Sequence, residues 1–349
     1  MEKTEAMGSY VPMDEDFRLK NNADEIALDS NFAAQSFWRD VLIRFFGRAS
    51  ALIGLVLIVL ITIMAVIGPG MNDYTYSGQE LSQKNLAPRV PGLEKLGIFN
   101  GSESMTTTTG TKTVNYYEEK GLDGVYYWFG SDNFGRDIWT RTWSGARVSL
   151  IIAVAAAVID MIIGMSYGLI SGYFGGRVDM VMQRCLEVAN GIPRLVVVTL
   201  LLLVLKPGMV TIVVALMLTE WIGMSRIARA EMLKLKEQEF VLASRTLGAG
   251  SFFIIFKEIL PNIIGPIITQ VMFSIPTAIF TEAFLSFVGL GIPVPQCSLG
   301  SLISEGFNSF TTHPYQIIPP IIVMALLMLS FNLVADGLRE ALDPKMKEM

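Results

Sequence analysis

The sequence has few of the residue types that metal sites and catalytic sites most often need. Its 349 residues include a single histidine, His313, and two cysteines, Cys185 and Cys297. One histidine excludes most histidine-based metal and acid–base sites, and two distant cysteines form neither a disulfide scaffold nor a zinc site. We therefore expect no catalytic residues, no bound metal and no cofactor.

Charged residues are also scarce. Asp, Glu, Lys and Arg make up 17% of the chain, whereas soluble domains carry about 25%. With 27 basic and 32 acidic residues, the chain lacks the basic excess that is typical of nucleic-acid binders. The phosphate-binding pattern Gly-x-x-x-x-Gly-Lys-Ser/Thr is missing from the sequence, so we do not expect the chain to bind and hydrolyse ATP itself.

Long apolar runs are what the sequence has instead, and 52% of its residues are hydrophobic. A helix that crosses a bilayer needs about 20 predominantly apolar residues. Runs of this kind cover residues 49–67, 148–170, 192–224, 263–288 and 317–335. The third run is long enough for two helices, because Lys206-Pro207-Gly208 predicts a turn within it. The helix before this turn is short unless it extends back past Arg194 toward Leu186. We predict an all-α polytopic membrane protein with six transmembrane helices.

The distribution of positive charge predicts the orientation of these helices. Fifteen Lys and Arg residues flank the helix ends that lie on the same side of the membrane as the N-terminus. The short connections on the other side hold only Lys206. Because Lys and Arg concentrate in the cytoplasmic loops of membrane proteins, both termini are expected to be cytoplasmic.

The runs divide the chain into five parts. They are a cytoplasmic tail that ends in an interfacial helix (1–48), the first transmembrane helix (49–69), an extracytoplasmic loop or insertion (70–146), a core with the other five helices (147–336) and a second cytoplasmic tail (337–349). The interfacial helix is predicted over Ser36–Arg48, where aromatic residues are mixed with arginines as in segments that lie on a bilayer. The insertion contains the low-complexity stretch Thr106–Gly110, which has no power to form a core, and we expect a small cap there.

The most informative segment lies between the fourth and fifth helices, over Ser225–Asn262. It is longer than the roughly 2–8 residues that usually connect helices in a bundle. A short helix is predicted over Glu237–Leu247, because apolar residues recur there at helical spacing. The residues that share its apolar face are Phe240, Ala243 and Leu247.

Glycines predict where this short helix ends. Gly248-Ala249-Gly250 follows it, and glycine is the usual residue just past a helix C-terminus. Ser251 can begin a second helix, which we expect to end at Pro261. An apolar face on a short cytoplasmic helix suits either a groove in a partner protein or the surface of the bilayer, and the periodicity alone favours neither.

The same segment resembles the cytoplasmic signature loop of ABC importer permeases, whose pattern is Glu-Ala-Ala, three residues, Gly, nine residues and Ile-x-Leu-Pro. The positions that match it are Ala243, Gly248, Leu260 and Pro261, and those that depart from it are Leu242, Ser244 and Glu258. The segments Glu239-Phe240-Val241, Leu247-Gly248-Ala249 and Ile259-Leu260-Pro261-Asn262, together with Ala243 and Arg245, resemble the dipeptide/oligopeptide (OppC/DppC-like) subfamily more closely.

Three further blocks resemble the same subfamily. They are Phe129–Asp137 with the following Gly145-Ala146-Arg147, then Gly172–Asp179, and finally Glu282–Ile292 with the later Phe331–Pro344. The blocks occur in the order of the subfamily, and the resemblance extends over residues 36–70 and 129–345. The insertion lies outside the shared pattern, and its role stays open.

The resemblance implies the type I ABC importer permease fold, with an outer-loop insertion between helices 1 and 2, in the plasma membrane. The partners that it implies are a second homologous permease subunit, two ATP-binding subunits, an extracytoplasmic solute-binding protein, the lipid bilayer and a peptide substrate. Each ATP-binding subunit would receive one coupling helix, and peptide would enter the cytoplasm by alternating access. The resemblance implies coupling roles for Glu239, Phe240, Ala243, Arg245, Gly248, Leu260 and Pro261.

Three acidic residues lie within the predicted membrane helices. A charge at the bilayer centre costs at least about 2.5–3.5 kcal/mol, so Asp160 is expected to face the bundle, either lining the pathway or making a structural hydrogen bond. Glu220 is expected near the inner end of the fourth helix, as a snorkelling or interhelix group. Glu282 is expected near the outer end of the fifth helix, where it can pair at the subunit interface.

Two other functions stay open at the level of the sequence. A nickel or other small-solute importer of the same subfamily shares the blocks quoted above. A secondary transporter or channel subunit belongs to a different class, and a secondary transporter would need an internal repeat, of which the sequence gives no clear sign.

Overall fold

The computed structural model describes residues 37–107 and 110–342. The chain divides into two units, residues 1–43 and 44–349. The first unit is described only by the residues it contributes to helix α2 (Phe37–Phe46). A helix therefore forms within Ser36–Arg48, where one was predicted, and its place at the membrane interface stays a prediction. The five-part division of the chain stays a prediction.

Five helical stretches of the described residues are long and apolar enough to cross a membrane. Within these stretches, four π- or 3₁₀-helical segments continue or interrupt the α-helices. The fifth stretch begins with a 3₁₀ turn. The stretches are α3 (Ala49–Ile67) with η1 (Gly68–Gly70); α5 (Ile138–Ile159), η4 (Asp160–Gly164) and α6 (Met165–Phe174); α9 (Met209–Thr219) and α10 (Trp221–Leu235); α12 (Ser251–Phe253), η5 (Ile254–Ile259), α13 (Leu260–Leu285) and η6 (Ser286–Leu290); and η7 (Pro314–Gln316) with α15 (Ile318–Leu342).

A sixth candidate span is bent. Helices α7 (Gly176–Gly191) and α8 (Arg194–Val204) are together long and apolar enough to cross a membrane, but their axes meet at 79°. Proline lacks the backbone N–H that a helix needs and disfavours helical geometry in the residue before it, so Ile192-Pro193 breaks the helix. The third predicted helix therefore does not run straight back past Arg194 to Leu186. Counting the bent pair, the structure supports the predicted number of six.

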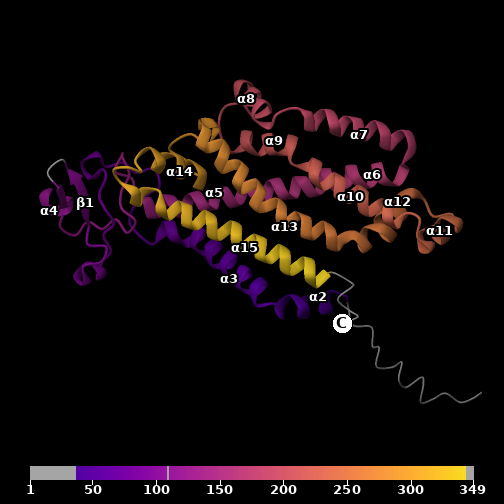
Figure 1. Cartoon of the computed structure of the whole chain (residues 1–349), viewed down its shortest axis with the longest axis horizontal. Helices are drawn as coiled ribbons and strands as arrows, with labels where there is room; N and C mark the ends of the chain where they lie inside the picture. Colours follow the sequence, from indigo (N-terminus) through magenta and orange to yellow (C-terminus); the bar gives the residue numbers. More distant parts are fainter. Residues whose placement is uncertain (1–36, 108–109, 343–349) are drawn as a thin grey trace, which may run out of the picture. The chain divides into compact units, whose positions relative to one another are not determined.

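The long helices pack into one bundle. Helices α3, α5, α13 and α15 run alongside one another in Figure 1, and α5 contacts all three of the others. Their shared core contains alanines and branched apolar residues, among them Ile152, Ala156, Ile279 and Leu327. Small residues at helix contacts let backbones approach closely, which is how helices associate in a bilayer.

Helix α10 continues further than the sequence predicts. Residues 225–235 were expected to be loop, yet they form the second half of the span Met209–Leu235. The reason is packing against α6, where Ala228 and Met232 are buried against Gly168 and Gly172. Of the basic residues that suggest a loop, Arg229 pairs with Asp179 on α7 and Lys234 is exposed.

A second boundary also differs. The helix that begins at Ser251 does not end at Pro261 but continues to Leu290. Pro261 lies in the first turn of α13, where proline is tolerated because that turn has unbonded N–H groups in any case. The π-helical segment η5, just before it, changes the hydrogen-bond spacing and allows the chain to continue.

The contact between α6 and α10 yields a prediction on stability. A Cβ atom on Gly168 would lie 2.2 Å from the carbonyl oxygen of Ser225 and 2.8 Å from the Cβ of Ala228. Gly168→Ala is therefore expected to force the helices apart and to destabilise the protein by about 1–3 kcal/mol. Gly223→Ala on α10 is the matched control, because a Cβ there meets nothing within 4 Å. Thermal unfolding in detergent measures both, and equal midpoints for the two variants would contradict the packing argument.

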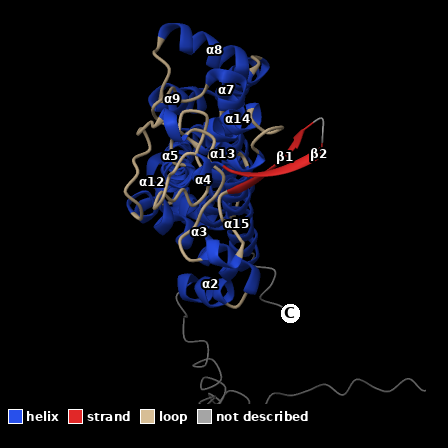
Figure 2. Ribbon diagram, turned by 90° about the vertical axis from the view of Figure 1, so that its left-hand side faces the viewer, coloured by secondary structure: helices blue, strands red, loops and turns tan. Residues whose placement is uncertain are grey.

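The insertion between α3 and α5 is not helical throughout. Strands β1 (Ser102–Thr107) and β2 (Gly110–Asn115) form an antiparallel hairpin, with Ser102 opposite Asn115 (Figure 2). The predicted all-α fold class is confirmed for the bundle, and the hairpin is a feature of the insertion that was not predicted. Threonine, being β-branched, suits a strand. The remaining elements are the short helices η2 (Leu81–Gln83), η3 (Leu93–Leu96) and α4 (Tyr116–Glu119).

The insertion has a small hydrophobic core of its own, which agrees with the small cap that was expected there. Leu86, Tyr117 and Tyr127 are buried against one another. Tyr74 stacks on Tyr127 with ring centroids 4.5 Å apart. The Tyr117 hydroxyl donates a hydrogen bond to the carbonyl of Ala87, and burial raises the pKa of this tyrosine. The insertion therefore has its own packed centre, despite the threonine-rich stretch.

Candidate functional site

Helix α11 (Glu239–Thr246) lies at the end of the bundle opposite the insertion (Figure 1). It agrees with the short helix predicted over Glu237–Leu247. Val241 anchors it in a buried cluster with Ile254 and Ile259 of the following helix. The predicted apolar face points outward instead, and the exposed residues of that face are Phe240, Ala243 and Leu247. This apolar face of α11 is therefore exposed and does not pack against the rest of the chain.

Gly248 ends α11 in a Schellman motif, as the sequence predicts. Its φ is +85°, in the left-handed region that glycine adopts without steric cost. The N–H of Gly248 donates to the carbonyl of Arg245, and the N–H of Ala249 donates to that of Ser244. Both bonds satisfy carbonyls that the helix end would leave unpaired, so Gly248 fixes the length and direction of α11.

The other predicted coupling residues lie around this helix. The Arg245 guanidinium lies 5.6 Å from the ring centre of Tyr173, at the end of α6. Glu239 is exposed in the first turn of α11, where a negative charge suits the helix dipole. Leu260 and Pro261 begin α13, and Leu260 packs against the cluster that holds Val241. The structure therefore links α11 to both α6 and α13.

An ion pair beside α11 was not assigned a role at the level of the sequence. Arg229 on α10 donates from Nε and Nη2 to the two carboxylate oxygens of Asp179 on α7, both at 2.6 Å. Lys236 donates to the carbonyl of Gly172 on α6 at 3.1 Å. The only sequence signal was the position of Asp179 in the block Gly172–Asp179. Together these contacts tie α6, α7 and α10 together at the end where α11 lies.

A polar cavity lies among the membrane helices α7 to α10 and α13. Its volume is about 280 Å³. At its wall Arg194 Nη1 lies 2.7 Å from Glu220 Oε1. Glu220 lies at the junction of α9 and α10 in the middle of their span, not near its inner end, because α10 continues to Leu235.

Asp160 lies behind this cavity. Its side chain is buried at the start of η4, and one carboxylate oxygen accepts a hydrogen bond from Ser274 on α13. Ser274 lines the cavity, whereas the lining residues do not include Asp160. Among the described residues the other carboxylate oxygen has no hydrogen-bond partner. Of the two expectations, the interhelix hydrogen bond is the one present in this conformation.

Glu282 is enclosed by its own chain. The side chain is fully buried, and it accepts hydrogen bonds from Ser149 on α5 at 3.0 Å and from Ser286 at 2.8 Å. The expected pairing at a subunit interface does not fit this position. The carboxyl instead joins α5 to the end of α13, close to Ser298, which caps α14 (Leu299–Asn308).

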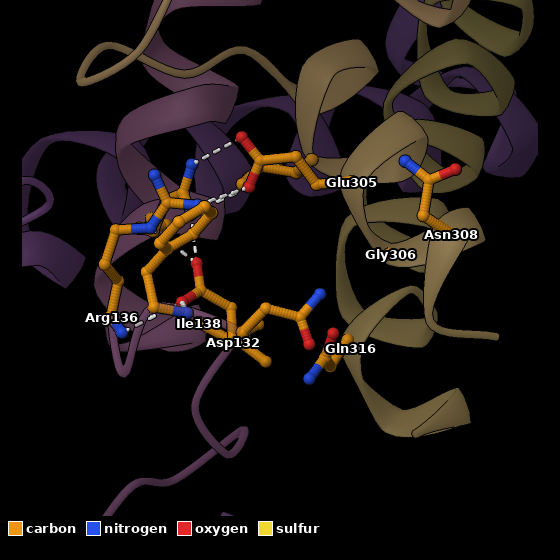
Figure 3. A pocket seen from close by; sticks show the side chains of 11 residues that line it. Asp132, Arg136, Ile138, Glu305, Gly306, Asn308 and Gln316 are labelled. Atoms are coloured by element: carbon orange, nitrogen blue, oxygen red, sulfur yellow. Dashed lines mark hydrogen bonds and ion pairs between the residues drawn. The ribbon is translucent and has the colours of Figure 1, made fainter. Parts of the chain in front are cut away.

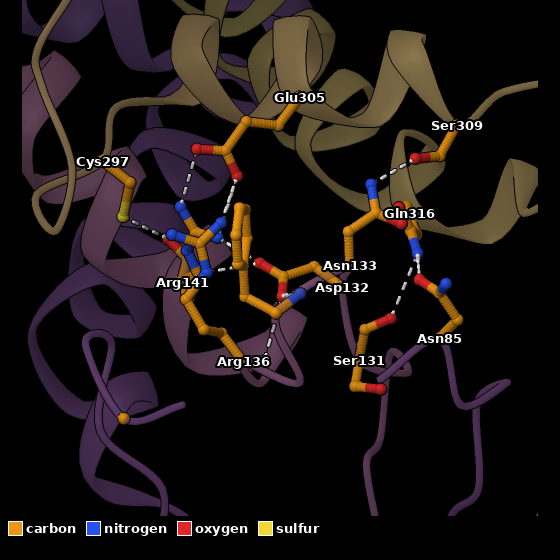
Figure 4. Close-up of polar contacts among 12 residues, drawn as sticks. Asn85, Ser131, Asp132, Asn133, Arg136, Arg141, Cys297, Glu305, Ser309 and Gln316 are labelled. Carbon is orange, nitrogen blue, oxygen red and sulfur yellow. Dashed lines mark hydrogen bonds and ion pairs between the residues drawn. The ribbon is translucent and has the colours of Figure 1, made fainter. Parts of the chain in front are cut away.

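A cluster of four charged side chains joins the insertion end of α5 to α14 (Figures 3 and 4). Arg136 lies 2.6 Å from Asp132 and 2.7 Å from Glu305, and Arg141 binds Glu305 through two nitrogens at 2.9 and 3.1 Å. Arg141 also pairs with Asp132. Both arginines are only 1% exposed. Beside the cluster is a cavity of about 140 Å³.

The cluster was not predicted, although Asp132, Arg136 and the later Arg141 lie in or near a quoted block. Asp132 and Arg136 are four residues apart, but Glu305 is distant in the sequence. Cys297 adds a further contact, because its thiol donates to the carbonyl of Arg141. Burial raises the pKa of this thiol, which keeps it protonated and able to donate.

Comparison with known proteins identifies relatives along most of the chain. The family model of binding-protein-dependent transport system inner membrane components matches residues 161–348. The model of the N-terminal TM domain of oligopeptide transport permease C matches residues 36–88. The oligopeptide transport system permease protein OppC of Bacillus subtilis (strain 168) is 41% identical over 313 residues, 90% of this chain and 91% of that protein.

Dipeptide permeases have a similar level of sequence identity to this chain. The dipeptide transport system permease protein DppC of the same organism is 40% identical over 93% of this chain and 90% of its own. Among solved structures, a chain of the MetNI methionine ABC transporter, in an inward-facing conformation, has a TM-score of 0.50. It is 15% identical, over 58% of this chain and 96% of its own, so this likeness concerns the fold alone.

Proposed function

This chain belongs to the family of binding-protein-dependent transport system inner membrane components, and we propose that it moves oligopeptides or dipeptides into the cytoplasm as a permease subunit of an ATP-driven importer. The resemblance to ABC importer permeases is confirmed. The chain is a multi-pass membrane permease and not an enzyme, since ATP is hydrolysed on separate subunits of such transporters.

One observation carries the choice of substrate. The relatives that are named for oligopeptide and dipeptide transport are 40–41% identical to this chain over at least 90% of its length. The match therefore extends over at least nine-tenths of this chain. The cavity at Arg194 and Glu220 supports the same choice over nickel, because its lining has two guanidinium groups against one carboxylate, and a net positive charge disfavours a divalent cation.

The proposed assembly has two related permease chains, two ATP-binding subunits and an extracytoplasmic solute-binding protein. In this assembly α11 is cytoplasmic and the insertion faces outward, in the plasma membrane. The excess of Lys and Arg at the α11 end supports that orientation, with both termini cytoplasmic. The exposed apolar face of α11 supports docking into a groove of an ATP-binding subunit.

The proposed coupling path starts at α11. Movement of the ATP-binding subunits would shift α11, and the contact between Arg245 and Tyr173 would pass this shift to α6. The pair Asp179–Arg229 extends the path to α7 and α10. Helix α10 continues directly to Glu220 at the cavity, so a motion of α11 can change the access to the cavity.

Reconstitution tests the proposed function. The chain would be co-expressed with a candidate second permease, ATP-binding subunits and solute-binding protein from the same organism, and placed in liposomes. We expect ATP-dependent uptake of labelled dipeptides or oligopeptides and no uptake of nickel ions. Nickel uptake without peptide uptake would favour the alternative importer, and solute uptake by this chain without ATP would favour a secondary transporter or channel.

A cysteine at position 160 tests the place of Asp160 in the pathway. Because the side chain is buried behind Ser274 in this conformation, labelling of Asp160→Cys by a water-soluble reagent is expected only in nucleotide states that open the cavity. The background variant is Cys185→Ser, since Cys185 is exposed. A cysteine that is labelled in no nucleotide state would remove Asp160 from the pathway.

A further inference from the structure

The cavity among α7 to α10 and α13 is polar although it lies within membrane-spanning helices. The residues that line it are Asn190, Arg194, Thr219, Glu220, Ile222, Gly223, Arg226, Gln270, Phe273, Ser274 and Thr277. A charged side chain at the bilayer centre costs at least about 2.5–3.5 kcal/mol and therefore faces other protein or water. An open cavity with this lining fits a water-filled transport pathway and not the lipid.

The charges of this wall are unequal. Two guanidinium groups, Arg194 and Arg226, face a single carboxylate, Glu220. Glu220 already lies 2.7 Å from Arg194, and both contacts of Arg194, to Glu220 and to Thr281, use the same nitrogen, Nη1. The Arg194 side chain is 42% exposed. The lining residues therefore carry one net positive charge, with Asp160 behind Ser274 as the nearest further carboxylate. The guanidinium of Arg194 has a surface that is open to a ligand.

Neutral polar groups complete the wall. Asn190 and Gln270 carry amides, which both donate and accept hydrogen bonds, and Ser274 and Thr277 carry hydroxyls. These are the groups that a peptide backbone can pair with. The volume of about 280 Å³ lies just below the roughly 300–1,000 Å³ typical of ligand pockets. The cavity therefore has room for the end of a peptide and not for a long peptide as a whole.

We propose that this cavity binds the C-terminal carboxylate of the peptide during its passage, with Arg194 and Arg226 as the recognising groups. The proposal rests on the proposed function. Guanidinium groups bind carboxylates through paired, charge-assisted hydrogen bonds. A peptide whose C-terminus is an amide cannot form these bonds as strongly, so the permease itself discriminates against it.

The first test compares uptake of a free peptide with uptake of its C-amidated and N-acetylated forms, in the reconstituted importer with one binding protein throughout. We expect Arg226→Gln and Arg194→Lys each to lower uptake of the free peptide by about tenfold. The ratio of free-peptide uptake to C-amide uptake should fall toward one. Arg184→Gln on α7 is the matched control, because Arg184 is 74% exposed and does not line the cavity.

Each outcome of this test has a clear meaning. Wild-type importer that takes up no peptide overturns the proposed function itself. Peptide uptake with a ratio of acid to amide that neither arginine variant changes overturns the carboxylate site alone. Discrimination that shifts to the N-acetylated form assigns the cavity to the other peptide terminus and also overturns the proposal.

A second test needs no transport. Thr277→Cys, in the Cys185→Ser background, places a thiol at the cavity wall. In the assembled importer an anionic thiol reagent should react faster than a cationic one of the same size, and Arg226→Gln should lower that ratio several-fold. Free peptide, but not its C-amide, should protect the thiol. Equal reagent rates in the parent, or equal protection by acid and amide, would contradict the assignment.

Discussion

Gly248→Asp is expected to abolish ATP-driven uptake while the chain stays folded in the membrane. The substitution places a side chain on a residue with φ of +85°, and left-handed geometry costs an L-residue about 1–2 kcal/mol. It also adds a negative charge at the negative end of the α11 dipole, which costs about 0.3–1 kcal/mol more. Neither cost unfolds a bundle of this size, because a Cβ at Gly248 meets nothing within 4 Å. The loss would come from the exposed surface, where α11 meets its partner.

The controls separate backbone strain from charge. Gly248→Asn has the same shape as the aspartate variant and adopts left-handed geometry readily, so it should keep much of the uptake. Gly250→Ala lies two residues on with φ of −74° and should behave as the parent. Membrane levels by immunoblot, peptide uptake and binding-protein-stimulated ATPase activity are the measurements. Full uptake by the aspartate variant would refute the coupling role of Gly248.

The features that local sequence determines were the ones that could be predicted. The run of apolar residues at 49–67 forms α3 with the same bounds, because a long apolar helix needs no particular neighbour to be recognised. Helix α11 and its end at Gly248 were predicted for the same reason. Capping and helical spacing are encoded within about ten residues of the chain.

The errors occurred where distant residues decide the structure. Helix α10 continues to Leu235 because glycines on α6, far away in the sequence, accept Ala228 and Met232. The charge pattern of the same residues, read locally, favoured a loop. Helix α7 forms before Pro193, although its composition is too polar for an ordinary span.

The polar contacts of the site are also long-range. Glu282 was placed correctly near the end of the fifth helix, yet its partner Ser149 lies 133 residues away. Glu305 lies 164 residues from Arg141. A single sequence indicates that an acidic residue in a membrane helix must have a partner, but it does not identify that partner. The cavity wall at Arg194 and Glu220 depends on three separate segments in the same way.

Arg141→Met is the substitution with the largest expected effect on stability. The side chain is 1% exposed and binds both Asp132 and Glu305. Its removal leaves two carboxylates with only Arg136 between them. Breaking a fully buried ion pair by removing one partner costs about 3–5 kcal/mol. Here Arg136 still contacts both carboxylates and the Glu305 side chain is 33% exposed, so we expect a loss of about 3 kcal/mol. Thermal unfolding of the detergent-solubilised protein should show a large drop in the midpoint.

Two further variants show whether the imbalance of charge is the cause. Arg184→Met breaks an exposed pair with Glu187 and should cost at most about 1 kcal/mol. Adding Glu305→Gln to Arg141→Met restores the balance of one arginine and one carboxylate, so the double variant should be more stable than Arg141→Met alone. If the two losses simply add, Arg141 acts through packing and not through its charge. A recovery would show that α14 is held to the start of α5 by matched charges, because Glu305 is the only member of the cluster that α14 contributes.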